Sequence, residues 1–281
     1  MSFIKLSNKI IIDDLKDFNI DHILLCGQIF RYRKTDYGYD VLSRDKIARV
    51  YVFSDKVEIV TDDVDYFYDY FDLNTDYAKV KEELSKFSQL QEPLKFGYGI
   101  RILRQDIFET IISFIISANN NIKRIQGIIE RISEGFGTKN GDFYAFPTLE
   151  QLKKADESFY KSIGAGYRSA YLSKVVFQLE NEEFDIEKLQ QMNTEDLRKQ
   201  LIKLCGVGPK VADCILLFGF GRGDVFPVDT WTRKVYEQDF GGSGKLKEGI
   251  KITQFFVEKF GTLAGVAQQY LFFHKRSGEE G

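Results

Sequence analysis

A single lysine stands at the start of a strongly apolar segment. Residues 206–214 read GVGPKVADC, and Lys210 is followed by VADCILLF, in which Asp213 is the only charged residue. Apolar surroundings disfavour the protonated form of an amine, and a neutral amine attacks electrophilic carbon to form a Schiff base. The alternative is a surface lysine whose stem covers apolar groups and whose ammonium pairs with Asp213, three residues later.

The residues before Lys210 predict a glycine hairpin between two helices. Gly206 and Gly208 permit a tight turn, and Pro209 is favoured at the first position of a helix. We therefore expect one helix to end at Leu204 or Cys205 and a second helix to carry Lys210 in its first turn. The free amides at such a helix start bind phosphate readily.

Asp229 is the second candidate for chemistry. It follows the apolar segment VFPV and precedes TWTRKVYEQDF, which has the character of a helix. The simplest role is a helix N-cap, for which Asp is strongly preferred. A carboxylate held in this way is also rigid. It could face Lys210 across the hairpin and stabilise a cationic sugar or orient a nucleophile.

The elements around these residues predict an α+β fold. IARVYVF (47–53), VEIVT (57–61), YDVLS (39–43) and HILLCGQIF (22–30) are typical of strands, whereas apolar residues recur at helical spacing from about residue 98 onward. We predict an N-terminal antiparallel sheet domain with flanking helices (1–97), the acidic segment 61–86 included. A helical helix–hairpin–helix domain (98–281) follows.

Two capping signals refine the helical part. Thr148 and Gln151 have capping-box spacing, and Asn193 precedes TEDLRKQLIKL as an N-cap. Each therefore predicts the start of a helix.

The composition limits the class of protein. Among 281 residues there are three cysteines, at positions 26, 205 and 214, and two histidines. These argue against a disulfide framework, a four-thiolate iron–sulfur cluster and a zinc site. The apolar runs are too short to span a bilayer, and the first residues lack the apolar core of a signal peptide. We expect a monomeric cytoplasmic protein.

The formal net charge of −3 counts against a nucleic-acid partner, because such domains are usually basic. Binding needs only a local basic face, however. The segment 61–76 holds many aspartates and neither lysine nor arginine, and it could lie far from any phosphate.

These motifs resemble the superfamily of DNA glycosylases that share a helix–hairpin–helix, a Gly-Pro-rich loop and an aspartate. GVGPKVADC followed by VFPVD resembles its 8-oxoguanine DNA glycosylase branch in particular. Further segments resemble that branch in the same order: LLCGQIFRY (24–32), FIISANNNIKRI (114–125), GAGYRSAYL (164–172) and LAGVAQQYLF (263–272).

The resemblance implies a bifunctional enzyme that acts on double-stranded DNA containing 8-oxoguanine. Lys210 would attack the sugar C1′ and displace the base, the resulting Schiff base would permit β-elimination, and Asp229 would stabilise the developing positive charge. The Gly27 carbonyl would accept the N7–H that 8-oxoguanine has and guanine lacks. The base pocket would also contain Cys214, Phe218, Gln268 and Phe272.

The resemblance also assigns residues to the DNA around the flipped base. Asn119 would fill the gap, Tyr167 would wedge beside the opposite base, and Arg124 and Arg168 would read a cytosine there. The hairpin amides of Gly206 and Gly208 would hold a phosphate. The backbone carbonyls of Ile202, Leu204 and Val207 would hold a structural cation. No cofactor would be needed for chemistry.

Three positions depart from the eukaryotic pattern of the branch. Trp231 replaces a DNA-facing histidine, Lys275 replaces the acidic residue that partners it, and Phe218 replaces a methionine. The preference for cytosine therefore stays open, and a prokaryotic source is favoured. Two alternatives also remain: a monofunctional glycosylase for another damaged purine, and a non-catalytic helix–hairpin–helix DNA-binding protein.

Overall fold

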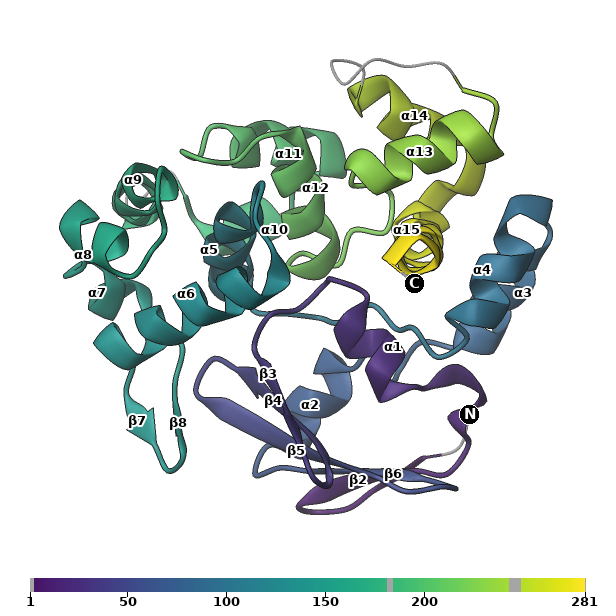
Figure 1. The fold of residues 1–281 in the computed structure, drawn as a ribbon, viewed down its shortest axis with the longest axis horizontal. Coiled ribbons are helices and arrows are strands. Elements are labelled where there is room, and N and C mark those ends of the chain that lie inside the picture. Colours follow the sequence, from purple (N-terminus) through teal and green to yellow (C-terminus); the bar gives the residue numbers. More distant parts are fainter. Residues whose placement is uncertain (1–2, 181–183, 243–248, 281) are drawn as a thin grey trace.

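The computed structural model describes residues 3–180, 184–242 and 249–280. An antiparallel sheet lies below a larger set of helices in Figure 1. This confirms the predicted α+β class and the order of the two parts.

The sheet has six strands in the order β1-β2-β6-β5-β4-β3, each antiparallel to its neighbours. Val50 of β5 pairs with Ile59 of β6, so the hairpin predicted between them is confirmed. The strand predicted at 39–43 is also confirmed. The bounds are β1 Phe3–Lys5, β2 Lys9–Ile12, β3 Tyr32–Thr35, β4 Gly38–Ser43, β5 Lys46–Val52 and β6 Val57–Val60.

The strand predicted at 22–30 is wrong. Helix α1 spans Ile20–Leu25, and a loop follows it. Asn19 caps the helix, because its side chain accepts a hydrogen bond from the backbone N–H of His22 at 3.1 Å. The short run ILL is apolar in either structure, so its pattern alone does not distinguish strand from helix.

Helices make up most of the remaining chain. As predicted, the acidic segment forms helices, because Asp63 and Asp76 cap α2 and α3. The helices are α2 Val64–Tyr70, α3 Tyr77–Ser85, α4 Gln91–Phe96, α5 Ile107–Ser117, α6 Ile122–Phe136, α7 Leu149–Leu152, α8 Glu157–Ser162, α9 Arg168–Glu180, α10 Ile186–Gln190, α11 Thr194–Ile202, α12 Pro209–Phe218, α13 Thr230–Asp239, α14 Gly249–Phe260 and α15 Ala264–Glu280; a small hairpin joins β7 Lys139–Asn140 to β8 Phe143–Tyr144.

The capping signals read from the sequence are confirmed. Thr148 and Gln151 form a capping box at the start of α7. The Asn193 side chain accepts a hydrogen bond from the backbone N–H of Asp196 at the start of α11.

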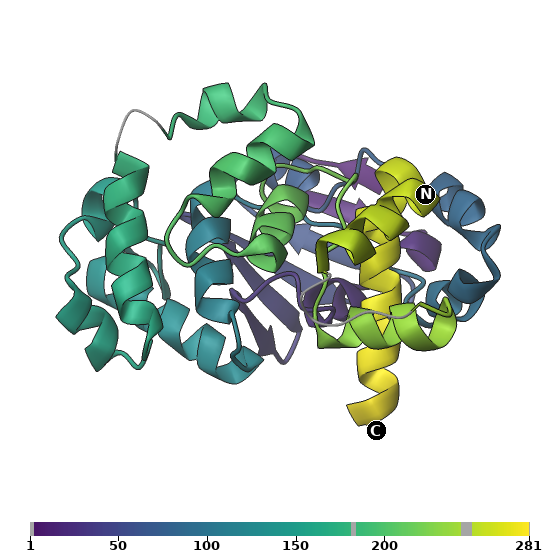
Figure 2. The same cartoon turned by 90° about the horizontal axis from the view of Figure 1, so that it is seen from above.

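Three apolar clusters hold the fold together. One packs α1 and α2 against the sheet, and a second surrounds α5 and α12 in the helical part. The third joins Leu84, Leu90 and Leu94 to Phe226 and Tyr270. Helices α3 and α4 accordingly lie beside α15 in Figure 1, and Figure 2 shows α13 crossing α15.

None of the helices in the described residues combines the length and the apolarity needed to cross a membrane.

Candidate active site

The predicted glycine hairpin connects α11 to α12. Gly206 has φ +86°, a conformation that side chains disfavour, and the Val207 N–H donates to the Leu204 carbonyl at 3.0 Å. Gly208 is the extended N-cap of α12, with Pro209 at its first turn. The helix–hairpin–helix prediction is confirmed, although α11 ends at Ile202, earlier than predicted.

Lys210 lies in the first turn of α12 above aromatic rings. Its ammonium is 5.5 Å from the centroid of the Phe114 ring, which stacks on Phe218 at 5.4 Å and 18°. Phe114 and Phe218 are buried in the cluster of α5 and α12. The lysine therefore stands at the edge of an apolar floor that includes the predicted pocket residue Phe218.

The alternative pairing of Lys210 with Asp213 is wrong. Asp213 is buried and accepts a hydrogen bond from the Arg198 Nε at 2.6 Å. It also accepts from the Thr253 hydroxyl at 3.4 Å. Asp213 therefore joins α12 to α11 and α14, and Lys210 is directed to another surface of the helix.

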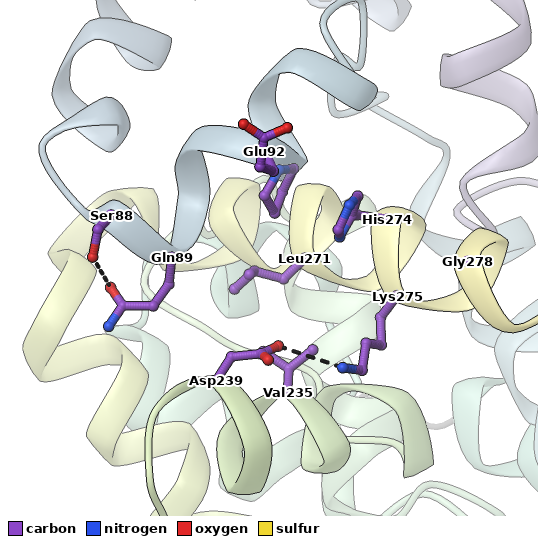
Figure 3. A pocket seen from close by; sticks show the side chains of 10 residues that line it. Ser88, Gln89, Glu92, Val235, Asp239, Leu271, His274, Lys275 and Gly278 are labelled. Carbon is purple, nitrogen blue, oxygen red and sulfur yellow. Dashed lines mark hydrogen bonds and ion pairs between the residues drawn. The ribbon is translucent and has the colours of Figure 1, made fainter.

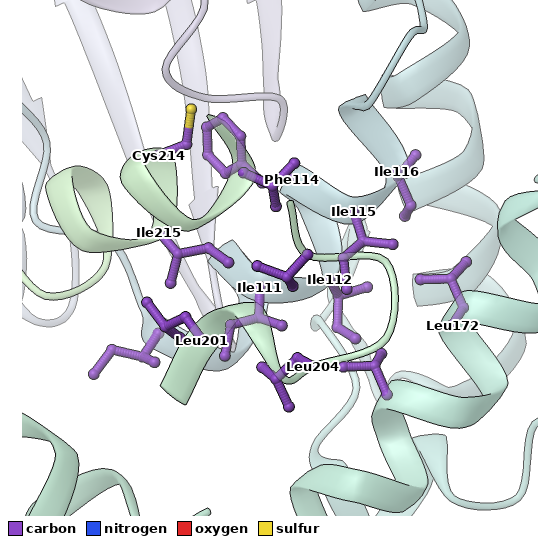
Figure 4. Close-up of a cluster of buried hydrophobic side chains, with 14 of the residues drawn as sticks. Ile111, Ile112, Phe114, Ile115, Ile116, Leu172, Leu201, Leu204, Cys214 and Ile215 are labelled. Atoms are coloured by element: carbon purple, nitrogen blue, oxygen red, sulfur yellow. The ribbon is translucent and has the colours of Figure 1, made fainter. Parts of the chain in front are cut away.

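The charges of Lys210 and Asp229 both act on the Cys214 thiol. Burial raises the pKa of this thiol to about 11; the Lys210 charge opposes the shift and Asp229 adds to it. Lys210 and Cys214 are one helical turn apart, so they share a face of α12. Cys214 lines the same cluster as Leu201, Leu204 and residues of α5 (Figure 4). The structure thus brings three predicted site residues together.

Asp229 is the N-cap of α13, as predicted. Its carboxylate accepts a hydrogen bond from the Thr232 N–H at 2.9 Å, and its own N–H donates to the Thr232 hydroxyl at 2.9 Å. The preceding chain is also fixed: the Phe226 carbonyl accepts from Thr253 at 2.9 Å, and its ring stacks on Phe256 at 3.9 Å. The carboxylate is therefore held rigidly.

Hydrogen bonds of Gln28 hold the loop that carries Gly27 in place. Gly27 has φ +84°. The fully buried Gln28 side chain donates to the Arg101 carbonyl at 2.8 Å and accepts from the Leu103 N–H at 2.9 Å. The Gln105 side chain in turn donates to the Gln28 carbonyl at 2.7 Å. A backbone carbonyl in such a loop has a defined direction.

Helix α15 lies against the loop that carries Gly27. A Cβ built on Gly27 would lie 3.2 Å from the Phe272 ring, so the loop and this ring touch. Gln268, one turn earlier, is buried and accepts a hydrogen bond from Gln269 at 2.7 Å. At the start of α15, Gly265 packs closely against Leu217 of α12. The helix is thereby tied to the one that bears Lys210.

Three of the residues predicted to contact DNA around the flipped base are on the surface, close to one another. Asn119 is exposed and has φ +51°. The Tyr167 side chain is exposed, and its hydroxyl donates to the Ala118 carbonyl at 3.1 Å. Arg124 is exposed and donates to the Gly164 carbonyl at 2.9 Å. These positions suit contacts with DNA.

Arg168 has a different environment, because it is only 2% exposed. Its Nε donates to the Ala118 carbonyl at 2.9 Å and its Nη2 to the Asn119 carbonyl at 2.7 Å. The guanidinium also lies 4.4 Å from the centre of the Tyr167 ring. Burial lowers the pKa of Arg168. In this conformation Arg168 supports Asn119 and Tyr167 from beneath, and its reading of cytosine stays a prediction.

Tyr171 connects this surface to the hairpin. Its ring lies 5.9 Å from the Tyr167 ring, edge to face. A Cβ built on Gly206 would lie 2.9 Å from the Tyr171 Cβ. The hairpin therefore packs against Tyr171, which in turn contacts Tyr167. The predicted phosphate site of the hairpin and the predicted wedge Tyr167 are thus neighbours.

Trp231 and Lys275, two of the positions that depart from the eukaryotic pattern, lie near opposite ends of α13. Trp231, in the first turn, has the Lys234 ammonium 4.6 Å from its ring centre. Lys275 pairs instead with Asp239, the last residue of α13, at 3.7 Å. Figure 3 shows this pair in a groove of about 570 Å³ between α4, α13 and α15. Lys275 thus pairs with Asp239, whereas the acidic residue at this position of the eukaryotic pattern would pair with the histidine at position 231.

The hairpin carbonyls fit the chemistry of a hard cation. Ile202, Leu204 and Val207 follow one another through the turn that ends α11, where the helix dipole is negative. The Leu204 carbonyl accepts one hydrogen bond, and its second lone pair can bind an ion. Elsewhere, the described residues hold no cluster of three His, Cys, Asp or Glu side chains suited to a metal.

Several supporting residues were not predicted from the sequence. Four of them act through contacts with residues at least 15 positions away in the chain: Gln28, Gln105, Arg198 and Tyr171. Only Gln28 had an available signal, since it stands next to the positive-φ Gly27 within the quoted motif.

Comparison with known proteins agrees with this geometry. The family model described as 8-oxoguanine DNA glycosylase, N-terminal domain, matches residues 10–111. The model described as HhH-GPD superfamily base excision DNA repair protein matches residues 112–260. Together they account for most of the chain.

Individual relatives agree as well. The crystal structure of Clostridium acetobutylicum 8-oxoguanine glycosylase/lyase in complex with double-stranded DNA containing cytosine opposite 8-oxoguanine is 38% identical, with a TM-score of 0.92, and the match covers 99% of each chain. A probable N-glycosylase/DNA lyase of Methanothermobacter thermautotrophicus is 34% identical over 76% of this chain and 75% of that protein. N-glycosylase/DNA lyase OGG1 of Arabidopsis thaliana is 33% identical, covering 73% and 60%.

The hairpin, the aspartate-capped helix and the sheet domain thus coincide with family matches along the chain, and the protein belongs to the 8-oxoguanine DNA glycosylase/lyase branch of the HhH-GPD superfamily of base excision DNA repair proteins.

Proposed function

We propose that this protein excises 8-oxoguanine from duplex DNA through Lys210 and then cleaves the strand. The observation that supports the proposal is that the Lys210 and Asp229 charges both act on the buried Cys214 thiol, next to a glycine hairpin that starts α12. A nucleophile, a fixed carboxylate and a phosphate-binding helix start then lie within one site.

In the chemical step, the neutral Lys210 amine forms a bond to the sugar C1′ while the bond from C1′ to the base breaks. The departing base takes the electron pair and a proton. Asp229 stabilises the positive charge that develops on the sugar. Because the carboxylate is fixed by Thr232, it needs no reorganisation when that charge appears.

The lyase step follows from the covalent intermediate. Ring opening converts the aminal at C1′ into a Schiff base, which acidifies the C2′ proton. Loss of that proton forms a double bond and expels the 3′ phosphate, breaking the strand. Water then hydrolyses the imine and releases Lys210.

Base recognition is assigned to the pocket between α12 and α15. Cys214 and Phe272 enclose the flipped base, Gln268 reads its Watson–Crick edge, and Phe218 lies in the floor. The Gly27 carbonyl accepts the N7–H of 8-oxoguanine. Guanine cannot donate there, so it leaves a desolvated acceptor unpaired, at a cost of about 1–3 kcal/mol.

The remaining residues hold the DNA. Asn119 fills the space left by the flipped nucleotide, Tyr167 wedges beside the opposite base, and Arg124 and Arg168 approach that base. Trp231 contacts DNA from α13. The hairpin amides of Gly206 and Gly208 bind a phosphate, and a cation on the nearby carbonyls would strengthen this contact without entering the chemistry. No redox cofactor is required, and the protein acts as a monomer on DNA in the prokaryotic cytoplasm.

The test is strand cleavage with borohydride trapping. Duplexes carrying one 8-oxoguanine opposite each of the four bases are incubated with the wild type, Lys210→Gln and the control Lys199→Gln. Lys199 is an exposed lysine paired with Glu195 on α11. We expect a trapped complex with the wild type and the control, and none with Lys210→Gln. The four duplexes measure how strongly cytosine is preferred.

Two other outcomes would favour the alternatives. Base release without any trapped complex would indicate a monofunctional glycosylase. DNA binding without base release from any duplex would indicate a non-catalytic DNA-binding protein. Trapping that persists in Lys210→Gln would remove Lys210 from the nucleophilic role.

A further inference from the structure

Arg276 joins α15 to the loop that carries Gly27. It lies one helical turn after Phe272, and its guanidinium carbon is 5.1 Å from the centre of the Phe272 ring. Its Nη2 donates a hydrogen bond to the Leu25 carbonyl. Its Nη1 would lie 3.3 Å from a Cβ built on Gly27. One side chain thus contacts both walls of the base pocket.

The Leu25 carbonyl is a favourable site for a cation. Leu25 is the last residue of α1, so this carbonyl lies beyond the reach of the helical hydrogen-bond ladder and at the negative end of the helix. The positive charge of Arg276 also acts on Cys26 and Tyr32, which bracket the loop. The charge of the guanidinium therefore acts on both ends of the loop.

The other contacts of the loop with α15 are apolar, because Cys26 packs in the same cluster as Tyr270, and the polar contacts of Gln28 are made elsewhere. Gln28 fastens the loop to residues 101–105, on the side of the sheet domain. Gly27 itself has no side chain that could grip the helix, and its positive φ makes a larger residue unfavourable. Among these contacts, that of Arg276 joins the loop directly to the turn of α15 that presents Phe272.

We propose that Arg276 is a positioning residue for base selection, which sets the gap between the Gly27 carbonyl and the Phe272 ring. This inference rests on the proposed function. A carbonyl can discriminate N7–H from a bare nitrogen only when it is held at hydrogen-bond distance and angle. Arg276 is distant from the reacting sugar carbon in this role, so it serves selection of the base and not the chemistry of Lys210.

Lysine is a poor substitute for this role. The planar guanidinium stacks on an aromatic ring and donates from its edge at the same time, whereas an ammonium is a point charge on a flexible stem. Arg276→Lys should therefore retain the charge and lose much of the selectivity. Arg276→Met removes the charge and the hydrogen bond while keeping an unbranched apolar stem.

The experiment compares three duplexes, which contain 8-oxoguanine, its 7-deaza analogue without the N7–H, or an abasic site. Single-turnover cleavage is measured for the wild type, Arg276→Met, Arg276→Lys and the control Lys275→Met. Lys275 is the neighbouring cation of α15, and it pairs with Asp239. Cleavage of the abasic duplex needs Lys210 but no base pocket.

We expect Arg276→Met to excise 8-oxoguanine about tenfold more slowly, the size expected for loss of a charge-assisted hydrogen bond. Its preference over the 7-deaza analogue should shrink by a similar factor, and abasic-site cleavage should stay within about twofold of the wild type. Arg276→Lys should follow Arg276→Met, and Lys275→Met should follow the wild type.

Equal losses on all three duplexes, or no loss on any, would overturn the inference while leaving the proposed function intact. A wild type that excises no 8-oxoguanine would overturn both. The melting temperature of each variant separates a local change in selectivity from a general loss of folded protein.

Discussion

Arg168 donates a hydrogen bond to the backbone carbonyl of Asn119 at 2.7 Å, across 49 residues of sequence. Asn119 has a positive φ and Arg168 is almost fully buried. The residue predicted to fill the gap in DNA is therefore held in its unusual conformation by a residue predicted to read the opposite base. Arg168 therefore combines two roles: it supports the Asn119 loop, and it is predicted to contact DNA.

Replacement of Arg168 should reduce stability as well as DNA recognition. We expect Arg168→Met to lower the free energy of unfolding by about 2–3 kcal/mol, because the partly buried hydrogen bonds to the Ala118 and Asn119 carbonyls lose their charged donor. Arg124→Met, at an exposed position, should change it by less than about 0.5 kcal/mol. Urea denaturation measures both. Equal stability of the two variants would argue against the supporting role.

Two substitutions at Asp229 separate its structural and chemical roles. Asn is as good an N-cap as Asp, so Asp229→Asn should retain the melting temperature and lose at least about 100-fold in excision rate with the carboxylate charge. Asp229→Ala should lose the activity and, in addition, about 1 kcal/mol of stability with the cap. Single-turnover kinetics and thermal melts test this pair. Full activity of Asp229→Asn would contradict the charge-stabilising role.

The two hairpin glycines should differ in their response to alanine. At Gly206 a Cβ would meet Tyr171 at 2.9 Å and φ is +86°, so Gly206→Ala should cost about 1–3 kcal/mol of stability. At Gly208 a Cβ would enter open space, so stability should change by no more than about 1 kcal/mol. DNA affinity should fall for Gly208→Ala, since the methyl group faces the proposed phosphate. Denaturation and titration with DNA check both, and unchanged affinity would remove Gly208 from the phosphate site.

Asp213 should make stability depend on pH. Burial raises the pKa of Asp213 to about 6, against the effect of Arg198. The native state therefore binds more protons than the unfolded state between the ordinary pKa of Asp and pH 6, and stability from this group falls as pH rises through that window. Asp213→Asn should gain stability relative to wild type from pH 4 to 6 and hold the gain above. Asp62→Asn, at an exposed site, is the control; a pH-independent difference would contradict the prediction.

The sequence predicted the elements whose signals are local. The strands at 46–52 and 57–60 were predicted from two β-rich runs separated by a short turn. The capping residues Thr148, Asn193 and Asp229 stand directly before their helices. The prediction for 22–30 was wrong because the apolar run is too short to show its period, although Asn19 stood in the N-cap position. Local signals thus predicted caps and hairpins better than short buried runs.

The candidate site was predictable only in part. Lys210, Cys214 and Asp229 were identified from motifs, and the structure brings them together. The alternative ion pair of Lys210 with Asp213 was wrong because α11 places Arg198 beside Asp213. The burial of Arg168 was not foreseen either, since it depends on a turn about 50 residues away. Which charged side chain is buried is decided by tertiary neighbours that spacing along one helix does not reveal.

The third apolar cluster has a consequence for synthesis of the protein on the ribosome. Cys26, which precedes Gly27, packs in the same cluster as Leu84 and Tyr270. Translation proceeds from the N-terminus, so the early segments must wait for α15 to leave the ribosome before this cluster can close. The nascent chain therefore exposes apolar surface until α15 has emerged. The pocket proposed for the damaged base can therefore be assembled only after α15 has been synthesised.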